Sequence, residues 1–251
     1  MIDAHIHLDD ERFDKNRQHL IAQAQRAGVA HFIVPAVQRK GIVKLKNLAI
    51  EHANIHACYG LHPYYIAAHH KQDIQALDNW LHQNKAIALG ECGLDFYLKD
   101  LDKNKQLFYF EAQIALAKAH NLPLVLHARG AVDAVFNCLK KQQYFNAMIH
   151  SYNGSIHQTK KLLDLGVKFS FGGAICHANA TKIHKLVKYC PADSIMFETD
   201  APDQNPCGRR TDLNLPINLG EIINCYARIC ATDAKQAQKQ SSLVCRDFFQ
   251  I

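Results

Sequence analysis

The chain has 251 residues, 48% of them hydrophobic, which is enough for one large core, and we expect a single domain over residues 1–251. No stretch approaches the roughly 20 apolar residues of a membrane helix, the N-terminus carries no secretion signal, and the nine scattered cysteines contain no Cys-x-x-Cys pair. These features argue against a membrane-spanning protein and a disulfide framework and predict a soluble, cytoplasmic protein, whose net charge of +6 suits an anionic substrate without identifying one.

Apolar runs rich in β-branched residues alternate with amphipathic stretches along the chain. Strands are expected at residues 2–6, 31–35, 55–59, 86–90, 123–126, 146–149, 167–171 and 194–198. Helices are expected at residues 14–27, 40–52, 73–83, 103–120, 131–142, 157–165, 179–189, 217–230 and 234–248. Strands separated by such helices indicate parallel βαβ units, and this strand count is the one that closes a TIM (β/α)8 barrel. The alternative is a doubly wound open sheet.

Two histidines follow the first apolar run. Because side chains on a strand alternate between its faces, His5 and His7 are expected to present both imidazoles to one point, where they could bind a metal. One buried and one exposed histidine is the alternative for an isolated pair.

Further predicted strands also stop at residue types that bind metals, namely Glu91, His127, His150 and Asp200. Taken singly, each histidine could be a hydrogen-bonded core residue, and Asp200 could be a turn residue before Pro202. Active sites of barrels form at the C-terminal ends of the strands, so the matching positions favour one shared site. Residues from strands this far apart in sequence converge only if the sheet closes, which favours the barrel over the open sheet.

The residue types in this set suit a pair of cations. A buried, unpaired Glu91 would be costly, and bridging two metals would satisfy both of its oxygens. Four imidazoles and two carboxylates are enough ligands for two divalent ions about 3.5–4 Å apart. Mixed nitrogen and oxygen ligation suits zinc, manganese or magnesium. Asp200, at the end of the last strand, could also take a proton from the attacking water.

Taken together, the motifs resemble the TatD family of metal-dependent deoxyribonucleases, within the amidohydrolase-like barrel superfamily. The resemblance runs in order from residue 1 to about residue 202 and rests on Asp3-Ala-His-Ile-His-Leu8, Gly60-Leu-His-Pro63, Gly90-Glu-Cys-Gly-Leu-Asp95, His127-Ala-Arg129, His150-Ser-Tyr-Asn-Gly154 and Glu198-Thr-Asp-Ala-Pro202.

The resemblance implies a two-metal centre. One metal would be held by His5, His7, Glu91 and Asp200, and the second by Glu91, His127 and His150. It also implies catalytic roles for Glu91 and Asp200, with Asp200 as the base.

Two further residues are implied to lie near the substrate phosphate. The first is His62, for which capping the turn at Pro63 is the alternative on spacing alone. The second is Arg129, for which a surface ion pair would be the ordinary alternative.

The chain departs from the family pattern in three places. The stretch Ser151-Tyr-Asn-Gly154 replaces a Ser-Phe-Ser-Gly loop but keeps its glycine, so binding need not be lost. The segment 203–210 resembles one bacterial subgroup more than the founding nucleases, which leaves substrate choice open. Its Arg209 and Arg210 could contact a nucleic-acid backbone or form a solvated basic loop. The last predicted helix lacks an asparagine often found there, which we expect to affect packing more than chemistry.

Three functions are compatible with these residues. The leading hypothesis is a two-metal hydrolase that cleaves phosphodiester bonds of DNA or a related nucleic acid, from an end because the barrel mouth is concave. The second is a metal-dependent amide or ester hydrolase of the same superfamily. Many of its C–N hydrolases bridge their metals with a carboxylated lysine, whereas this chain offers Glu91, which favours the phosphodiesterase. The third is a metal-stabilised scaffold without catalysis. Nucleic acid is the expected substrate, and no stable protein partner is evident.

Overall fold

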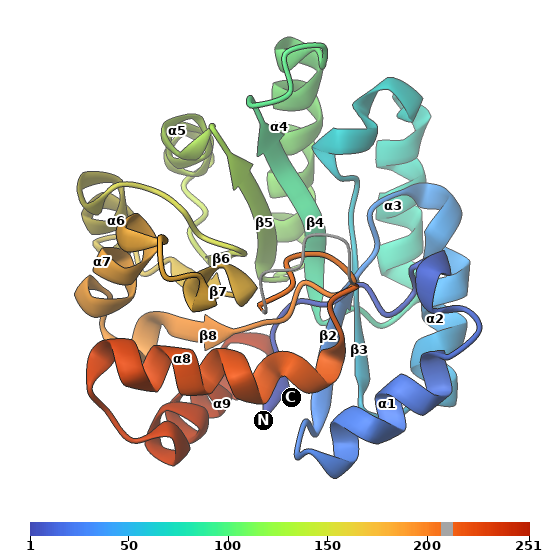
Figure 1. Ribbon diagram of the computed structural model, residues 1–251. Helices are drawn as coiled ribbons and strands as arrows, with labels where there is room; N and C mark the ends of the chain where they lie inside the picture. Colours follow the sequence, from blue (N-terminus) through green and yellow to red (C-terminus); the bar gives the residue numbers. More distant parts are fainter. Residues whose placement is uncertain (207–212) are drawn as a thin grey trace.

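The computed structural model describes residues 1–206 and 213–251 and shows a TIM barrel. Its eight strands form one parallel sheet in the chain order β1-β2-β3-β4-β5-β6-β7-β8, and the helices surround the strands (Figure 1). The predicted α/β barrel is confirmed, because each strand pairs in parallel with the next one along the chain.

The strands are β1 (Ile2–Asp3), β2 (His31–Pro35), β3 (Ile55–Tyr59), β4 (Ala88–Asp95), β5 (Leu124–Arg129), β6 (Ala147–Ile149), β7 (Lys168–Phe171) and β8 (Ile195–Phe197). The α-helices are α1 (Arg17–Arg26), α2 (Ile42–Glu51), α3 (Gln72–Gln83), α4 (Lys103–Ala119), α5 (Val132–Gln142), α6 (Ile156–Leu163), α7 (Thr181–Tyr189), α8 (Leu219–Cys230) and α9 (Ala234–Phe249). Short 3-10 helices are η1 (Glu11–Phe13), η2 (Arg39–Gly41), η3 (Pro63–Ala68), η4 (Gly173–Cys176), η5 (Ala192–Ser194) and η6 (Pro216–Asn218).

The barrel closes where the first and last strands meet. The Ala4 N–H donates to the Phe197 carbonyl at 3.0 Å, just beyond the end of β1. The Thr199 backbone N–H and hydroxyl donate to the two carboxylate oxygens of Asp3 at 2.9 and 2.6 Å. Asp3 is fully buried, so these bonds satisfy a carboxylate that would otherwise be costly to bury. The contact brings the two ends of the sheet together beneath the predicted ligands.

Two strands differ in length from the prediction. The first was expected over 2–6 but ends at Asp3, because the following backbone bonds alternately to the last strand and to β2. The fourth was expected over 86–90, since its apolar run stops at Glu91. It instead continues to Asp95, and residues beyond Gly90 pair with β5, Gly93 opposite His127. The longer strand places Glu91 and Asp95 on one rigid element.

The core has two layers, because successive strand residues face opposite ways. One set packs outward against the helices and includes Phe32, Val34 and Leu126. A smaller set fills the barrel interior and continues into α9; it comprises Ile2, Ala4, Ile33, Cys58, Ala88, Val125, Met148, Met196, Val244, Cys245 and Phe249. Helix α9 therefore covers the end of the barrel opposite the predicted ligands.

None of the described helices combines the length and the apolar character that crossing a membrane requires. Of the eight cysteines among the described residues, six are buried.

Candidate metal centre

Six predicted ligands from distant parts of the chain meet at the C-terminal end of the barrel. His5 and His7 follow β1, Glu91 lies within β4, His127 lies within β5, and His150 and Asp200 follow β6 and β8. Glu91 is 2% exposed and stands at the middle of the group. Its two carboxylate oxygens face different partners, which divides the donor atoms into two groups that share this one side chain.

The first donor group contains His5 Nε2, His7 Nε2, Glu91 Oε2 and Asp200 Oδ1. The two imidazole nitrogens are 3.3 Å apart. Glu91 Oε2 lies 3.2 Å from His5 Nε2 and 3.5 Å from His7 Nε2. Asp200 Oδ1 lies 3.5 Å from each of these nitrogens. The two imidazoles therefore meet at one point, as expected, but the regular strand ends at Asp3, so the alternation of side chains along a strand is not the reason.

The second donor group contains Glu91 Oε1, His127 Nδ1 and His150 Nε2. The carboxylate oxygen lies 3.3 Å from His127 Nδ1 and 2.9 Å from His150 Nε2. The two imidazole nitrogens are 3.2 Å apart. Three potential donor atoms are thus mutually adjacent on this side of Glu91.

The spacing of these atoms fits divalent ions. A tetrahedral ion with ligand bonds of about 2.0–2.1 Å holds its donors roughly 3.3–3.4 Å apart. Five separations within the first donor group, from 3.2 to 3.5 Å, bracket that value. The second group is slightly tighter and offers three donors. The donor chemistry and spacing therefore fit one ion on each side of Glu91.

Electrostatics keep the shared carboxylate ionised. Burial by itself disfavours the charged form of Glu91, but the imidazoles of His62, His150 and His5 outweigh it and hold the pKa of Glu91 well below its ordinary value. Burial also opposes protonation of His150, but Glu91 and Glu198 outweigh it and raise the pKa of His150 well above its ordinary value.

His62 lies beside Glu91 but differs in its protonation. Its Nδ1 accepts the Tyr64 backbone N–H at 3.0 Å, so the proton of the neutral ring is on Nε2. That Nε2 lies 2.9 Å from Glu91 Oε1, where it can donate. Burial lowers the pKa of His62 to about 4, which favours the neutral ring. The ring therefore caps the turn with Nδ1, the alternative considered on spacing, and faces Glu91 with Nε2.

Two carboxylates behind the donor atoms were missed by the sequence reasoning. Asp95 Oδ2 lies 3.1 Å from His127 Nε2 and accepts its proton, which leaves Nδ1 free to face Glu91. Glu198 Oε1 lies 3.6 Å from His150 Nδ1 and accepts the Ser151 N–H at 2.8 Å. Both residues stand in the motifs quoted above, and the even spacing of residues 91 and 95 on one strand could have indicated a shared face.

Asp200 is held by a further residue that sequence reasoning missed. The Gln204 side-chain amide donates to Asp200 Oδ2 and, through its carbonyl oxygen, accepts the Ser151 hydroxyl at 2.8 Å. This leaves Asp200 Oδ1 directed at the first donor group. Asp200 has a φ of +52°, in the left-handed region that aspartate tolerates better than most residues.

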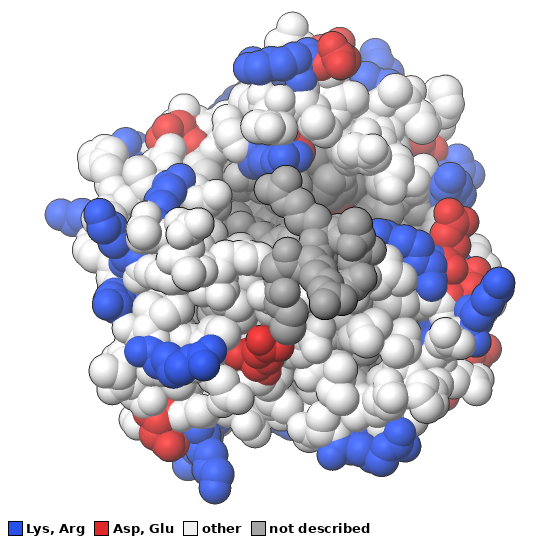
Figure 2. Space-filling view, in the orientation of Figure 1, with Lys and Arg blue, Asp and Glu red and all other residues white. Residues whose placement is uncertain are grey.

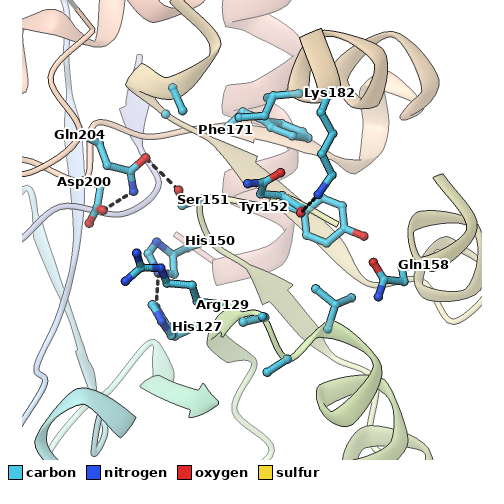
Figure 3. A pocket seen from close by; sticks show the side chains of 18 of the residues that line it. His127, Arg129, His150, Ser151, Tyr152, Gln158, Phe171, Lys182, Asp200 and Gln204 are labelled. Atoms are coloured by element: carbon cyan, nitrogen blue, oxygen red, sulfur yellow. Dashed lines mark hydrogen bonds between the residues drawn. The ribbon is translucent and has the colours of Figure 1, made fainter. Parts of the chain in front are cut away.

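A cavity of about 880 Å³ opens beside the second donor group (Figure 3). His127, His150 and Asp200 line it, and so does Arg129 at the end of β5. The Arg129 guanidinium lies 3.9 Å from the centre of the Tyr97 ring, a stacking contact in place of the surface ion pair considered above. Arg209 and Arg210 lie outside the described residues.

Figure 2 shows lysine and arginine at separate positions on one face of the molecule, both at its rim and nearer its centre, with acidic side chains among them. The net positive charge is therefore spread out over the visible described surface.

Comparisons with known proteins agree with this geometry. The chain is 31% identical over 232 residues to the uncharacterized metal-dependent hydrolase YjjV of Escherichia coli K12, covering 91% of this chain and 88% of the relative. It is 28% identical over 259 residues to the protein named 3'-5' ssDNA/RNA exonuclease TatD of Erwinia amylovora, covering 99% of each. The crystal structure of the E. coli TatD homologue YjjV superposes with a TM-score of 0.96 at 28% identity, covering 100% of this chain and 98% of that one. A sequence model of the TatD-related DNases matches residues 2–250, so the chain belongs to this family of metal-dependent hydrolases.

Proposed function

We propose that this hydrolase is a two-metal phosphodiesterase that cleaves DNA or a related nucleic acid from an end, in the cytoplasm. The observation that carries the proposal is the division of Glu91, whose two oxygens face separate groups of donor atoms. One ion would be held by His5, His7, Glu91 and Asp200, and the other by Glu91, His127 and His150. Zinc, manganese and magnesium all suit this mixed donor set.

Phosphodiester hydrolysis needs an activated water and a place for negative charge. When bound, two divalent ions would lower the pKa of the attacking water and offset charge on the phosphoryl oxygens. Asp200 accepts the proton of that water as general base, and Gln204 orients its carboxylate by donating to Oδ2. Glu91 takes part in catalysis because its two carboxylate oxygens belong to different donor groups, so its side chain would set the distance between the two ions.

The protein's own cations and donors would hold the substrate. His62 carries its proton on Nε2, which faces Glu91 Oε1 in the structure; with Glu91 holding metal ions, this N–H would be available to hydrogen-bond a phosphate oxygen, and the Tyr64 N–H orients the ring. Arg129 supplies a guanidinium at the cavity, and its contact with Tyr97 restricts where that charge lies. Guanidinium binds phosphate through two parallel hydrogen bonds, which suits this role.

The comparisons favour nucleic acid as the substrate and an end as the place of cleavage. The Erwinia amylovora relative is named for 3'-5' exonuclease action on single-stranded DNA and RNA. The concave cavity beside the donor atoms suits the end of a strand better than the middle of a duplex. Hydrolysis of an amide or ester bond is the alternative, and Glu91 in place of a bridging lysine disfavours it.

The experiment that tests the proposal combines metal content with a substrate screen. Protein stripped by a chelator is reloaded with zinc, manganese or magnesium and offered single-stranded and duplex oligonucleotides, small phosphodiesters, amides and esters. We expect two ions per chain and release of nucleotides from an oligonucleotide end.

Variants make the result specific. Asp200→Asn should lower kcat by roughly 100-fold or more, the scale of a general base, and His127→Ala should lose metal. His19→Ala, on the exposed face of α1, is the matched control and should behave as the wild type. Intact oligonucleotides together with cleaved amides or esters would replace the phosphodiesterase by the alternative hydrolase.

A further inference from the structure

The cavity beside the donor atoms extends to one side only. It begins at His127, His150 and Asp200 and continues over the C-terminal ends of β5, β6 and β7 to the start of α7. Among the described residues, none before Phe96 lines it. A strand with one phosphate at the donor atoms would therefore continue in this direction.

Lys182 stands at the far side of this cavity. It lies in the first turn of α7, and Figure 3 shows its amine directed toward the loop after β6, on the other side of the view from Asp200. Its Nζ donates to the Asn153 carbonyl at 2.7 Å. An ammonium group has three N–H donors, so this bond leaves two available to a ligand.

Among the described residues, no carboxylate forms an ion pair with Lys182 Nζ, which donates to the Asn153 carbonyl. Asp133 also lines the cavity, but its Oδ2 accepts the Gln158 side-chain amide at 2.7 Å. Phe171 and Ile175 provide apolar wall between the loops. Lys182 and Arg129 both line this cavity, and cations beside apolar surface suit a ligand that repeats an anionic group next to an aromatic base.

We infer that Lys182 binds a second phosphate of a nucleic-acid strand whose scissile phosphate lies at the metal centre. The inference rests on the proposed phosphodiesterase and adds the direction in which the strand runs, across β5, β6 and β7. Lysine is a point charge and binds phosphate without reading the base, so it adds affinity for a longer strand with no sequence preference.

The competing explanation is that Lys182 only holds the loop after β6 through its bond to Asn153. Three substitutions separate the two roles. Lys182→Gln keeps an N–H donor and removes the charge, Lys182→Arg keeps the charge, and Lys182→Ala removes both. Lys185→Ala, one turn further along α7, exposed and absent from the cavity lining, is the matched control.

The measurement is the ratio of kcat/KM for a single-stranded oligonucleotide to kcat/KM for bis(p-nitrophenyl) phosphate, which has only one phosphate. With Lys182→Gln and Lys182→Ala we expect this ratio to fall about tenfold, the scale of one charge-assisted hydrogen bond. The dependence of oligonucleotide affinity on salt should weaken by about 0.7 in its logarithmic slope, as for one lost phosphate contact to a single strand. Lys182→Arg should restore most of the ratio, and Lys185→Ala should match the wild type.

The remaining outcomes contradict either the role of Lys182 or the proposed phosphodiesterase activity. A Lys182→Gln enzyme with the wild-type ratio and salt slope, or one that loses activity equally on both substrates, overturns the role of Lys182 and leaves the phosphodiesterase standing. Wild-type enzyme that cleaves neither substrate overturns the proposed function itself, and the inference about Lys182 with it.

Discussion

At the scale of single residues, the carboxylate behind a histidine decides which nitrogen that histidine offers. Asp95 accepts from His127 Nε2 with Oδ2, while its Oδ1 accepts the Tyr97 backbone N–H at 3.1 Å. The hydrogen bond from the Tyr97 backbone orients the Asp95 carboxylate, and this carboxylate orients the His127 ring. Metal-binding histidines are commonly held in this way, which sets their tautomer and raises their basicity.

Asp95→Asn is therefore expected to impair the second donor group while the fold is kept. The asparagine carbonyl can still accept the backbone N–H, but its amide would face His127 Nε2 with a donor and favour the wrong tautomer. We expect a loss of about 10–100-fold in metal affinity or kcat/KM. Metal analysis and kinetics check this, with exposed Asp100→Asn as control. Wild-type values for both quantities would show that Asp95 does not position His127.

At the scale of elements, close approach of β4 to β5 depends on glycine. Gly93 has a φ of +133°, and a Cβ built on it would lie 2.1 Å from the His127 carbonyl oxygen. Gly166, after α6, has a φ of +79° but no atom within 4 Å of such a Cβ. The two positions share a positive φ and differ in the space around them.

This difference predicts unequal costs for the same substitution. Gly93→Ala should lower the free energy of unfolding by about 4 kcal/mol or more, because backbone must move and the β4–β5 register would be lost. Gly166→Ala should cost only about 1–2 kcal/mol, the conformational penalty of a left-handed alanine. Urea unfolding of both variants measures the costs. Similar values would mean that the β4–β5 approach can relax.

The start of the β2–β3 pair predicts a dependence of stability on pH. His31 Nδ1 lies 3.0 Å from His56 Nε2. Burial, with His31, Lys85 and Arg246 as positive neighbours, lowers the pKa of His56 to about 4. The folded protein therefore resists a proton that the unfolded chain accepts below about pH 6.5. The stability that neutral His56 contributes is present above that pH and decreases as the pH falls from 6.5 toward 4.

His56→Gln isolates this contribution, because glutamine stays neutral throughout. We expect the free energy of unfolding of the wild type to fall more steeply between pH 7 and pH 4.5 than that of the variant. Urea titrations with chelator present at each pH keep metal binding out of the comparison. Parallel curves for the two proteins would show that His56 titrates alike in the folded and unfolded states.

At the scale of the whole molecule, the last helix completes the barrel. Residues of α9 belong to the same apolar cluster as the inward-facing strand residues, and Phe249 is 2% exposed. Arg246 of α9 lies 3.3 Å from His31 at the start of β2, at the same end. We propose that residues 1–251 accordingly unfold as one domain.

Phe249→Ala tests this dependence on α9. Removing a buried phenylalanine should cost about 3–5 kcal/mol, whereas Leu243→Ala, at a side chain that is 52% exposed on the same helix, should change stability by no more than about 0.5 kcal/mol. Fluorescence and far-ultraviolet circular dichroism should report one coincident transition for both variants. Separate transitions would indicate that α9 unfolds independently of the barrel.

The sequence by itself determined the elements and the residue types at the site. Alternating strands and helices set the barrel, and His5, His7, Glu91, His127, His150 and Asp200 could be selected because apolar runs end beside residues that bind metals. Both inferences use local periodicity, which neighbouring residues along the chain specify.

Only the tertiary structure decided how these side chains are used. The division of Glu91 between two donor groups, the proton on His62 Nε2 and the place of Lys182 across the cavity each depend on atoms from different strands and loops. The register between neighbouring strands and the exact ends of β1 and β4 determine the distances between these side chains. No local pattern encodes them, because they arise only when the sheet has closed and brought its first and last strands together.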